Sequence, residues 1–555
     1  MSVNKVTPKI AHKFVAWPLL WVWSFLWFGC GGDGCQRFES PRAFVPEHAT
    51  AVVAFSSPEA LRSSITGFVG GLGAIDGVIA WLGGNYGINF GDSDGLEDAG
   101  IDPAMEMIAF YADEVWTFVS GVSDTNKMDG LVNQRLKVLG YPDASLDQTG
   151  EPKLKIALGD VVSGRPTVAW GFRANVLFVS WGGATVDVAS SVRKWMARPP
   201  DGSGALSTAK FQALWASLPN APVSTTVMVD LAPWVKQEDQ VDAWVKPLGY
   251  VAGAAKEVLQ GAQSLVLRVG VFEDRIDIRC KLGIDPQTMG WAKEWFLDAP
   301  PGFAVGSILP RDTTALVRTR IQADKIRAVP SFLRSALIPS GVLKAIHPLL
   351  ETTDLDKDLL SYIRGNIAFA FLGLAEGAAP GKILTARRFS DGLPLLEAAL
   401  IFDVHKSEEF WGRFTKLTEF AQKSGYQLTA AKPAGKATLV TKLVHEKNGE
   451  HLAAFLLDNT VIITAGVQAY LGLRDVLEGR STELSKRIES QLLADVAADS
   501  PLLLGIVTTF SRISRELGER GAPPFYLRTL DSIFEAGARI GAEPDGLRFD
   551  LEVIQ

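Results

Sequence analysis

The sequence predicts an α+β protein: two tandem, diverged copies of an antiparallel-sheet unit, with helices packed on one face of each sheet. Three observations support this prediction. Strands with alternating apolar and polar residues recur along the chain, tight hairpin turns join some of them, and four features return in the same order in the second half. Alternation with a period of two is typical of a strand with one buried face, and hairpins join antiparallel strands.

Length and composition bound the class of protein before any motif is considered. At 555 residues the chain exceeds what one core usually supports, so two or more units are expected. Hydrophobic residues make up 47% and charged residues 21%, an ordinary globular balance without disordered bulk. The net charge is −7 and no basic cluster occurs, so nucleic acid is not an expected partner.

The first thirty residues have the three parts of an export signal. The basic start contains three lysines and no acidic residue: Lys5, Lys9 and Lys13. Residues 14–29 follow without a charge, and the small residue Gly29 stands directly before Cys30. This arrangement predicts a signal peptide at residues 1–29 and a short flexible tether at 30–41.

The junction Trp27-Phe28-Gly29-Cys30 resembles the lipobox of bacterial lipoproteins. In that family a peptidase cuts before the cysteine, and the cysteine sulfur carries the lipid, so the resemblance implies lipidation at Cys30. Trp27 and Phe28 are larger than the residues that the family prefers there, and Cys35 is therefore the alternative lipidation point. A glycine follows Cys30, where aspartate would favour retention in the inner membrane, so the resemblance implies the outer membrane.

Two other interpretations of this leader stay open. The first is an uncleaved membrane anchor, because residues 14–32 would form a helix of about 28 Å against a hydrocarbon core of about 30 Å. Against it stand Pro18 and the glycines at positions 29, 31 and 32, which disfavour helix where a span still needs it. The second is ordinary secretion after cleavage. All three interpretations place the body of the chain outside the cytoplasm.

The chain contains only three cysteines, Cys30, Cys35 and Cys280, which excludes a disulfide scaffold. If Cys30 carries lipid, Cys35 and Cys280 could pair. Cys280 lies in an alternating apolar run, residues 276–282, and this predicts a small residue of the core instead.

Four features that appear twice divide the body into two copies. They are a strand entered through a proline (44–55 and 308–317), a hairpin followed by a helix (167–182 and 452–466), a helix leading through a proline into a strand (206–231 and 484–510), and a closing alternating strand (274–282 and 545–553). Asp458-Asn459 supplies residues that tolerate the left-handed backbone of a tight hairpin. We therefore assign residues 42–290 to the first copy, 291–301 to a linker and 302–555 to the second copy.

Amphipathic helices are expected to cover the sheets. Residues 57–59 (Ser-Pro-Glu) are a strong helix start, and the apolar residues that follow recur at helical spacing on one face as far as Leu82. A second such helix begins at Ser407 and carries its apolar stripe to Ala421. The first helix has glycines on its other face, which fits either close packing of another backbone or a mobile flap over an apolar ligand.

The body also resembles an uncharacterised group of exported bacterial proteins, classed only as domains of unknown function. The resemblance rests on the repeated strand phrase at 46–53 and 310–317 and on the strand-then-helix run 400–417. The group brings no known activity, substrate or catalytic residue to this chain.

The motifs that would carry chemistry are incomplete. His445 and His451 are too far apart for a zinc-protease motif and flank Asn-Gly, so this segment predicts a solvated hairpin. The acidic loop 92–95 has its glycine too early for a calcium loop. His48 precedes a strand and is expected at the surface. No metal, cofactor or catalytic residue is therefore predicted.

Tryptophan is distributed unevenly after the leader: ten of eleven lie at or before Trp295, and Trp411 alone lies in the second copy. Tryptophan fills cores, and it also favours places where one edge of the ring meets water. Core filling is one explanation of the asymmetry, and a ligand groove or membrane-facing surface in the first copy is the other.

These observations predict a non-enzymatic, lipid-anchored protein of the cell envelope, on the periplasmic or cell-surface face of the outer membrane. Its expected role is binding or structural, with a lipid, another apolar ligand or an envelope protein as partner. The alternative is an envelope hydrolase whose active site the sequence does not reveal. The oligomeric state stays open.

Overall fold

In the computed structural model the chain divides into two compact units, unit 1 (Met1–Asp285) and unit 2 (Pro286–Gln555), each described here by itself. The described residues are 41–71, 94–141, 144–147, 150–162, 164–198, 208–218, 225–236, 241–242, 256, 259–272, 274–285, 287, 304–322, 362–376, 378, 396–423, 426–430, 435–445, 451–486, 496–497, 504–519, 527, 533–543 and 545–555. The predicted signal peptide, the tether up to residue 40 and the linker 291–301 lie outside these residues and stay predictions.

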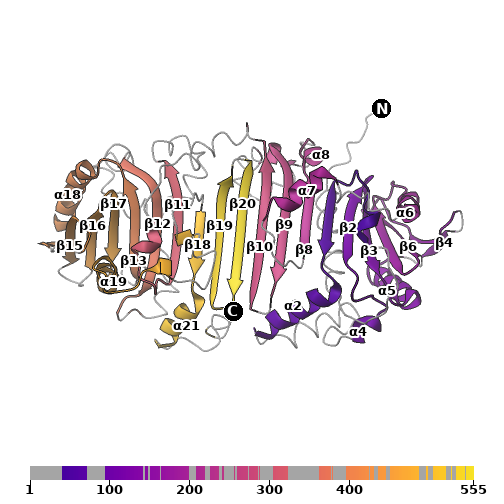
Figure 1. The fold of residues 1–555 in the computed structure, drawn as a ribbon, viewed down its shortest axis with the longest axis horizontal. Coiled ribbons are helices and arrows are strands. Elements are labelled where there is room, and N and C mark those ends of the chain that lie inside the picture. The colour runs from indigo at the N-terminus through magenta and orange to yellow at the C-terminus, as the bar shows by residue number, and fades with distance from the viewer. Residues whose placement is uncertain are drawn as a thin grey trace. The chain divides into compact units, whose positions relative to one another are not determined.

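The described part of unit 1 is built on an antiparallel sheet (Figure 1). Its strands are β1 (Ala51–Phe55), β2 (Met107–Ala112), β3 (Val115–Gly121), β4 (Ser145–Asp147), β5 (Leu154–Ala157), β6 (Thr167–Arg173), β7 (Val176–Gly182), β8 (Thr225–Asp230), β9 (Ala262–Val271) and β10 (Arg275–Ile284). Backbone pairing places them in the order β4-β5-β6-β7-β3-β2-β1-β8-β9-β10. The first strand along the chain therefore lies inside the sheet, between β2 and β8.

Short helices surround this sheet. They are η1 (Pro41–Phe44), α2 (Pro58–Gly71), α4 (Asp94–Glu97), α5 (Thr125–Val138), α6 (Val188–Ala197), α7 (Ala209–Ala216) and α8 (Ala232–Val235). Helix α2 begins at Pro58, as the Ser-Pro-Glu signal predicts, and the expected continuation to Leu82 lies outside the described residues. Asp124 caps α5, because its carboxylate accepts the backbone amides of Asn126 and Lys127.

Helices cover both faces of the unit 1 sheet, so the prediction that they pack on one face is wrong. On one face Val132 of α5 lies in a buried cluster with Phe118 and Val179. On the other face Val192 of α6 lies in a second cluster with Phe178. The physical reason is that both alternate sets of side chains are apolar along the central strands, and β7 is buried at every position.

The described part of unit 2 is likewise built on an antiparallel sheet. Its strands are β11 (Ala315–Gln322), β12 (Ile363–Leu374), β13 (Leu396–Val404), β14 (Tyr426–Ala430), β15 (Leu439–His445), β16 (His451–Leu457), β17 (Thr460–Ala465), β18 (Leu504–Thr508), β19 (Glu535–Glu543) and β20 (Gly546–Ile554). Their pairing order is β14-β15-β16-β17-β13-β12-β11-β18-β19-β20. Both units are therefore α+β, with antiparallel sheets and helices around them.

Helices cover both faces of the unit 2 sheet as well. The helices are η5 (Val305–Ser307), α18 (Ser407–Lys423), α19 (Val467–Leu477), η9 (Leu484–Lys486) and α21 (Phe510–Glu519). Leu473 of α19 packs in one buried cluster with Ile462, whereas Phe410 of α18 packs in another with Val461. Ile462 and Val461 are neighbours on β17 and point to opposite faces. Helix α18 begins at Ser407, as predicted.

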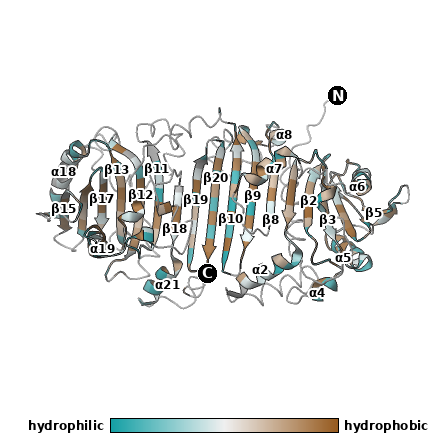
Figure 2. Cartoon of the chain, viewed as in Figure 1, coloured by the Kyte–Doolittle hydropathy of each residue, from teal (hydrophilic) through white to brown (hydrophobic). Residues whose placement is uncertain are grey.

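Local sequence signals account for the hairpins and the closing strands. The predicted hairpins β6–β7 and β16–β17 are both present, and their turns use residues with positive φ, Ala174 (47°) and Asp458 (51°). The alternation of hydrophobic and hydrophilic residues that predicted the last strand of each unit is visible along β10 and β20 (Figure 2).

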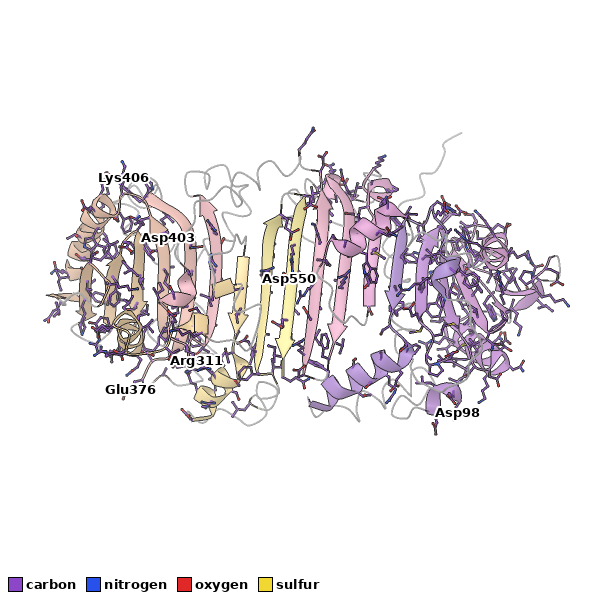
Figure 3. All side chains as sticks on the ribbon, viewed as in Figure 1. Asp98, Arg311, Glu376, Asp403, Lys406 and Asp550 are labelled. Carbon is purple, nitrogen blue, oxygen red and sulfur yellow. The ribbon has the colours of Figure 1, made fainter. Side chains whose placement is uncertain are left out.

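A buried polar network aligns four strands of unit 2. The carboxylate of Asp403 on β13 (Figure 3) accepts a hydrogen bond from the backbone amide of Asn366 at 3.0 Å and another from the Thr460 hydroxyl at 2.7 Å. The Asn366 side-chain oxygen accepts Nη2 of Arg318 at 2.7 Å, and Nη1 of Arg318 donates to the Val496 carbonyl at 2.9 Å. Arg318 is fully buried. Because a buried polar group without a partner is costly, this network favours one register of β11, β12, β13 and β17.

Candidate functional site

One face of the unit 2 sheet carries a row of apolar side chains that stay partly in solvent. Register pairing places five of them side by side, here called the open face: Val317, Phe369, Leu400, Ile463 and Ile506. Leu400 is 39% exposed and Ile506 is 38% exposed, and the other three are half-buried, with Ile463 packed against the cluster that contains Phe410 of α18. A contiguous apolar patch on a protein surface marks a site for a ligand, a partner or a membrane.

The opposite face of the same strands is closed. Leu316, Ile401 and Ile462 are each at most 1% exposed and belong to the cluster beneath α19. The exposure of the open face is therefore not explained by a lack of apolar residues in these strands, because the same strands carry buried apolar side chains on their other face. What differs is the cover that packs on each side.

Unit 1 has no such open row at the same place in its strand order, among the residues described. That row is Val227, Val53, Ala109, Phe118 and Val179, of which Val227 is half-buried and the other four are at most 4% exposed. It packs beneath α5 together with Leu96 and Ile101. Of these two rows, within the described residues, the unit 2 row alone contains side chains that are more than a third exposed.

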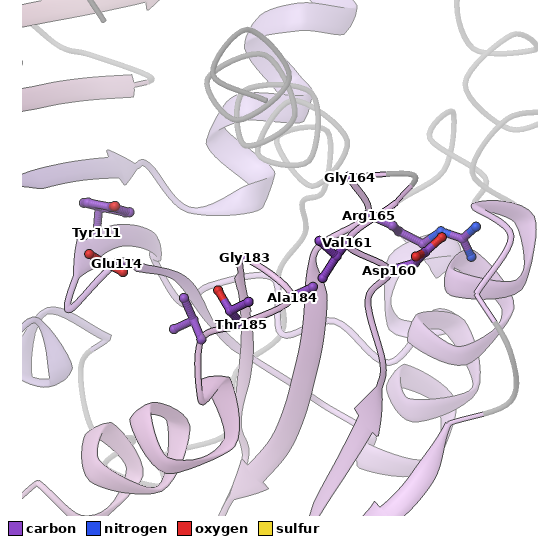
Figure 4. A pocket seen from close by; sticks show the side chains of 10 residues that line it. Tyr111, Glu114, Asp160, Val161, Gly164, Arg165, Gly183, Ala184 and Thr185 are labelled. Carbon is purple, nitrogen blue, oxygen red and sulfur yellow. The ribbon is translucent and has the colours of Figure 1, made fainter. Parts of the chain in front are cut away.

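Unit 1 contains a separate cavity of about 360 Å³ at one end of its strands (Figure 4). The β2–β3 turn, the β5–β6 connection and the β7–α6 connection meet there. The lining residues are Tyr111, Glu114, Asp160, Val161, Gly164, Arg165, Gly183, Ala184, Thr185 and Val186. Tyr111 and Glu114 lie toward one end in this view and Asp160 and Arg165 toward the other, so the lining has mixed polarity and both signs of charge.

Aromatic side chains adjoin this cavity. The ring of Tyr111 lies 5.4 Å from Trp116 and 4.9 Å from Trp234, and Trp116 stacks on Trp181 at 6.5 Å. Burial, with the nearby charge of Glu114 as a second cause, raises the pKa of Tyr111. Trp116 and Trp234 are half-buried, whereas Trp170, Trp181 and Trp195 are at most 3% exposed. Tryptophan in unit 1 therefore fills the core and also lines a partly open aromatic cluster.

Glu397 of β13 caps α19 of unit 2 from a neighbouring strand. It is 5% exposed, and its Oε2 accepts the Ala469 amide at 2.7 Å. Burial raises the pKa of Glu397, and the amides of the first turn of α19 oppose that effect. Gly466 precedes the helix with φ +100°, and a Cβ at this position would collide with the Glu397 carboxylate.

His451, the first residue of β16, is buried close to this cap. It is 6% exposed, and neither ring nitrogen has a hydrogen-bond partner among the described residues. Burial, with the charge of Lys442 as a second cause, lowers the pKa of His451 to about 4. The hairpin expected around residues 445–451 is present as β15–β16, but the expectation of a solvated segment is wrong for His451. Tyr470 of α19 covers the ring at 5.3 Å.

Acidification is expected to destabilise unit 2 through His451. The folded chain has a lower His451 pKa than the unfolded chain, so between about pH 6.5 and about pH 4 the unfolded chain binds a proton that the folded chain excludes. The contribution of His451 to the free energy of unfolding is fully present above that pH window. It falls as the pH drops through the window, by up to ~1.4 kcal/mol per pH unit. Calorimetric unfolding between pH 4 and 7 measures the slope, and His451→Phe should flatten it.

The matched control is His405→Phe, at a half-buried histidine of the same unit whose ring stacks on Tyr362 at 5.6 Å. The pH slope of the His451→Phe variant should be flatter than that of this control. An equal flattening by both variants, or none by His451→Phe, would contradict the assignment.

His48 lies at the surface, as expected. Its Nε2 is 3.1 Å from Asp113 Oδ1, and Lys194 Nζ donates to Asp113 Oδ2 at 2.7 Å. The hydrogen bond from Lys194 is the main cause that lowers the pKa of Asp113. All three side chains are between 41% and 56% exposed, so the cluster is a solvated ion pair network beside Trp195.

The other predicted positions are placed only in part. Cys30 and Cys35 lie outside the described residues, and Cys280 is half-buried on β10. Asp94 and Gly95, half of the acidic loop 92–95, belong to helix α4. Sequence reasoning missed that residues 91–95, Gly-Asp-Ser-Asp-Gly, have the Gly-x-Ser-x-Gly spacing of a nucleophile elbow. Its serine, Ser93, lies outside the described residues.

The described residues contain neither a candidate metal cluster nor a helix that could span a membrane. Within the described residues, no group of three or more histidine, cysteine, aspartate or glutamate side chains could hold a metal ion. None of the described helices is both long enough and apolar enough to cross a bilayer.

No family model matches the chain, and no curated protein matches it. Among solved structures, crystal forms IV, III and I of TP0453 are similar to it at 9% sequence identity, with TM-scores of 0.26, 0.25 and 0.26. These matches cover 44%, 48% and 46% of this chain and 80%, 89% and 86% of TP0453. A likeness at this TM-score supports no conclusion about fold or function.

Proposed function

We propose that this chain is a non-enzymatic, lipid-anchored protein of the cell envelope that binds an apolar or amphiphilic ligand. The anchor is Cys30, with Cys35 as the alternative, and the outer membrane is its favoured location. The proposal about the anchor rests on the basic, apolar and small-residue order of the leader.

The single observation that supports ligand binding most strongly is the open face of unit 2. Leu400 and Ile506 stand more than a third exposed in a row of strand residues whose reverse side is buried. Covering such a row with a hydrocarbon chain removes apolar area from water at roughly 25 cal/mol per Å². An apolar ligand or an apolar surface of a partner is the chemistry that fits.

We also propose that the two units are tandem, diverged copies. The pairing order of β11–β20 follows that of β1–β10 strand for strand, and the helices α5 and α18 each follow the third strand of their unit. The four repeated sequence features fall on matching strands in the two orders. In this proposal one copy closed its central apolar row and the other kept it partly open for the ligand.

Native mass spectrometry of the full-length protein, extracted in mild detergent, tests the binding proposal. We expect added mass from a non-covalent lipid or other apolar cargo, besides the covalent acyl mass on the N-terminal cysteine. A bare acylated chain would contradict apolar-ligand binding. Turnover in a hydrolase screen that Ser93→Ala abolishes would instead support the hydrolase alternative.

A double variant of the open face should lower the amount of bound cargo. Leu400→Gln with Ile506→Gln places amides in the row, and burying an amide against hydrocarbon without a hydrogen-bond partner costs about 1–3 kcal/mol. We expect cargo occupancy to fall about tenfold or more, while the melting temperature changes little because both side chains are partly exposed. Quantitative lipid extraction measures the occupancy.

The matched control is Val467→Gln, in the first position of α19. Val467 is 45% exposed and belongs to the helix that covers the opposite face. It should leave cargo occupancy unchanged. Equal loss in the control would point to general destabilisation and not to the open face.

A further inference from the structure

Large apolar side chains gather at one corner of unit 1. On the connection between β5 and β6, Leu158 is 66% exposed, Val161 is 63% exposed and Val162 is 96% exposed. Val138, at the C-terminal end of α5, is 69% exposed. The two segments adjoin, because Arg165 donates to the carbonyl of Gly140. We call these four side chains the apolar tip.

The backbone that carries the tip is held in place. Asp160 and Arg165 exchange two backbone hydrogen bonds of 2.9 Å, and the Asp160 carboxylate accepts the Val162 amide at 2.9 Å. The Tyr141 hydroxyl bonds the Pro166 carbonyl at 2.8 Å behind the tip. The described backbone on both sides of Val161 and Val162 is thus held by hydrogen bonds, so covering these side chains costs little extra conformational entropy.

The covering partner is identified by the charge beside the tip and by the tether of unit 1. The tip segment carries Arg165 and Asp160, and Arg135 and Lys137 lie in the last turn of α5 beside it, so three cationic side chains stand against one carboxylate, which suits anionic lipid headgroups.

Chain length brings unit 1 to the bilayer. The described chain begins at Pro41 in η1, which packs on the unit 1 sheet through Phe44 and Phe178. Cys30 precedes Pro41 by 11 residues, so a lipid on Cys30 is at most about 40 Å from unit 1. That reach exceeds the length of the seven-residue strand β7, about 23 Å. Either end of the unit 1 strands can therefore face the membrane.

We propose that the apolar tip inserts into the headgroup–acyl boundary of the membrane that holds the chain. The lipid anchor then fixes one point of unit 1 and the tip fixes a second, which sets the orientation of unit 1 on the bilayer. This inference rests on the proposed envelope anchoring, and it adds a contact that the anchor alone does not supply.

The test uses the full, acylated chain in vesicles of phosphatidylethanolamine and phosphatidylglycerol. Val162→Cys is labelled with an environment-sensitive dye in a Cys35→Ser and Cys280→Ser background, with Cys30 kept for the lipid. We expect blue-shifted emission, quenched at least about fivefold more strongly by nitroxide-bearing lipids than at a water-exposed site. Val162 is almost fully exposed, so its substitution should not disturb folding.

The matched control is Asp98→Cys, with the same dye. The Asp98 side chain is 82% exposed and lies near Lys127, at the opposite end of α5 from Val138, projecting away from the ribbon (Figure 3). It should emit as in water. Equal, water-like emission at residues 98 and 162 would overturn the proposal.

Two further outcomes are distinguishable. Flotation of the chain with the vesicles reports the anchor. A chain that floats but shows water-like emission at residue 162 contradicts the tip proposal and leaves the proposed function standing. Water-like emission at residue 162 in these vesicles with blue-shifted emission in native envelopes would indicate a protein partner, and it would equally overturn insertion into lipid.

Discussion

Replacing Cys30 by serine is expected to abolish lipidation and stable membrane attachment of the chain. The lipoprotein resemblance implies three acyl chains on this cysteine, whereas one chain gives only marginal binding at about 0.8 kcal/mol per buried methylene. Loss of all three removes far more membrane affinity than a few exposed valines could restore. Metabolic labelling with radioactive palmitate and flotation of membrane fractions measure the two effects.

Cys35→Ser is the control, and it should keep both labelling and flotation. Labelling that survives Cys30→Ser but disappears in Cys35→Ser would move the lipid to Cys35. A chain that floats without label in every form, with its leader intact, would favour the uncleaved anchor. A wild-type chain that is unlabelled and released would favour ordinary secretion.

Gly466→Ala is expected to destabilise unit 2 by about 3 kcal/mol or more. Its φ of +100° suits glycine alone, and the added Cβ would displace the buried carboxylate of Glu397. Displacement removes the acceptor of the Ala469 amide and leaves Glu397 buried without it. Both effects act on α19, the helix that closes one face of the sheet. Thermal unfolding, with hydrogen exchange of the α19 amides, measures the loss.

Variants of two other glycines separate the cost of the positive φ from the cost of displacing Glu397. Gly479 has φ +74° but open space where an alanine methyl group would lie, so Gly479→Ala isolates the backbone cost of about 1 kcal/mol. Gly412 lies in α18 with nothing within 4 Å, and Gly412→Ala should be neutral or stabilising by up to about 1 kcal/mol. A Gly466 variant no worse than the Gly479 variant would contradict a role for Glu397 as the cap.

The sequence was most informative where the signal is local. Proline-entered strands, the Asp458 turn and the starts of α2 and α18 all appear where the residues predict them. These features depend on backbone preferences and on contacts within a few residues, which a single chain displays directly.

The candidate surfaces were harder to predict. The open face is formed by strands far apart in the sequence, and Leu400 and Ile506 fall in one row only through the register of three strand pairings. The apolar tip had a sequence signal, the valine pair at 161–162, but its exposure depends on what packs nearby. His451 looked like a turn residue, and its burial depends on Tyr470 of a later helix.

The amino-acid sequence by itself determined an α+β chain with hairpins and repeated sequence features, and it predicts an export signal with a lipid anchor, because signal peptides, turns and strand periodicity are properties of short segments. Only the tertiary structure decided the order of the strands, the cover on both faces and the apolar row that stays in solvent. The physical reason is that burial is a property of pairs of distant surfaces: an apolar side chain on a strand becomes core or binding site according to which element packs over it.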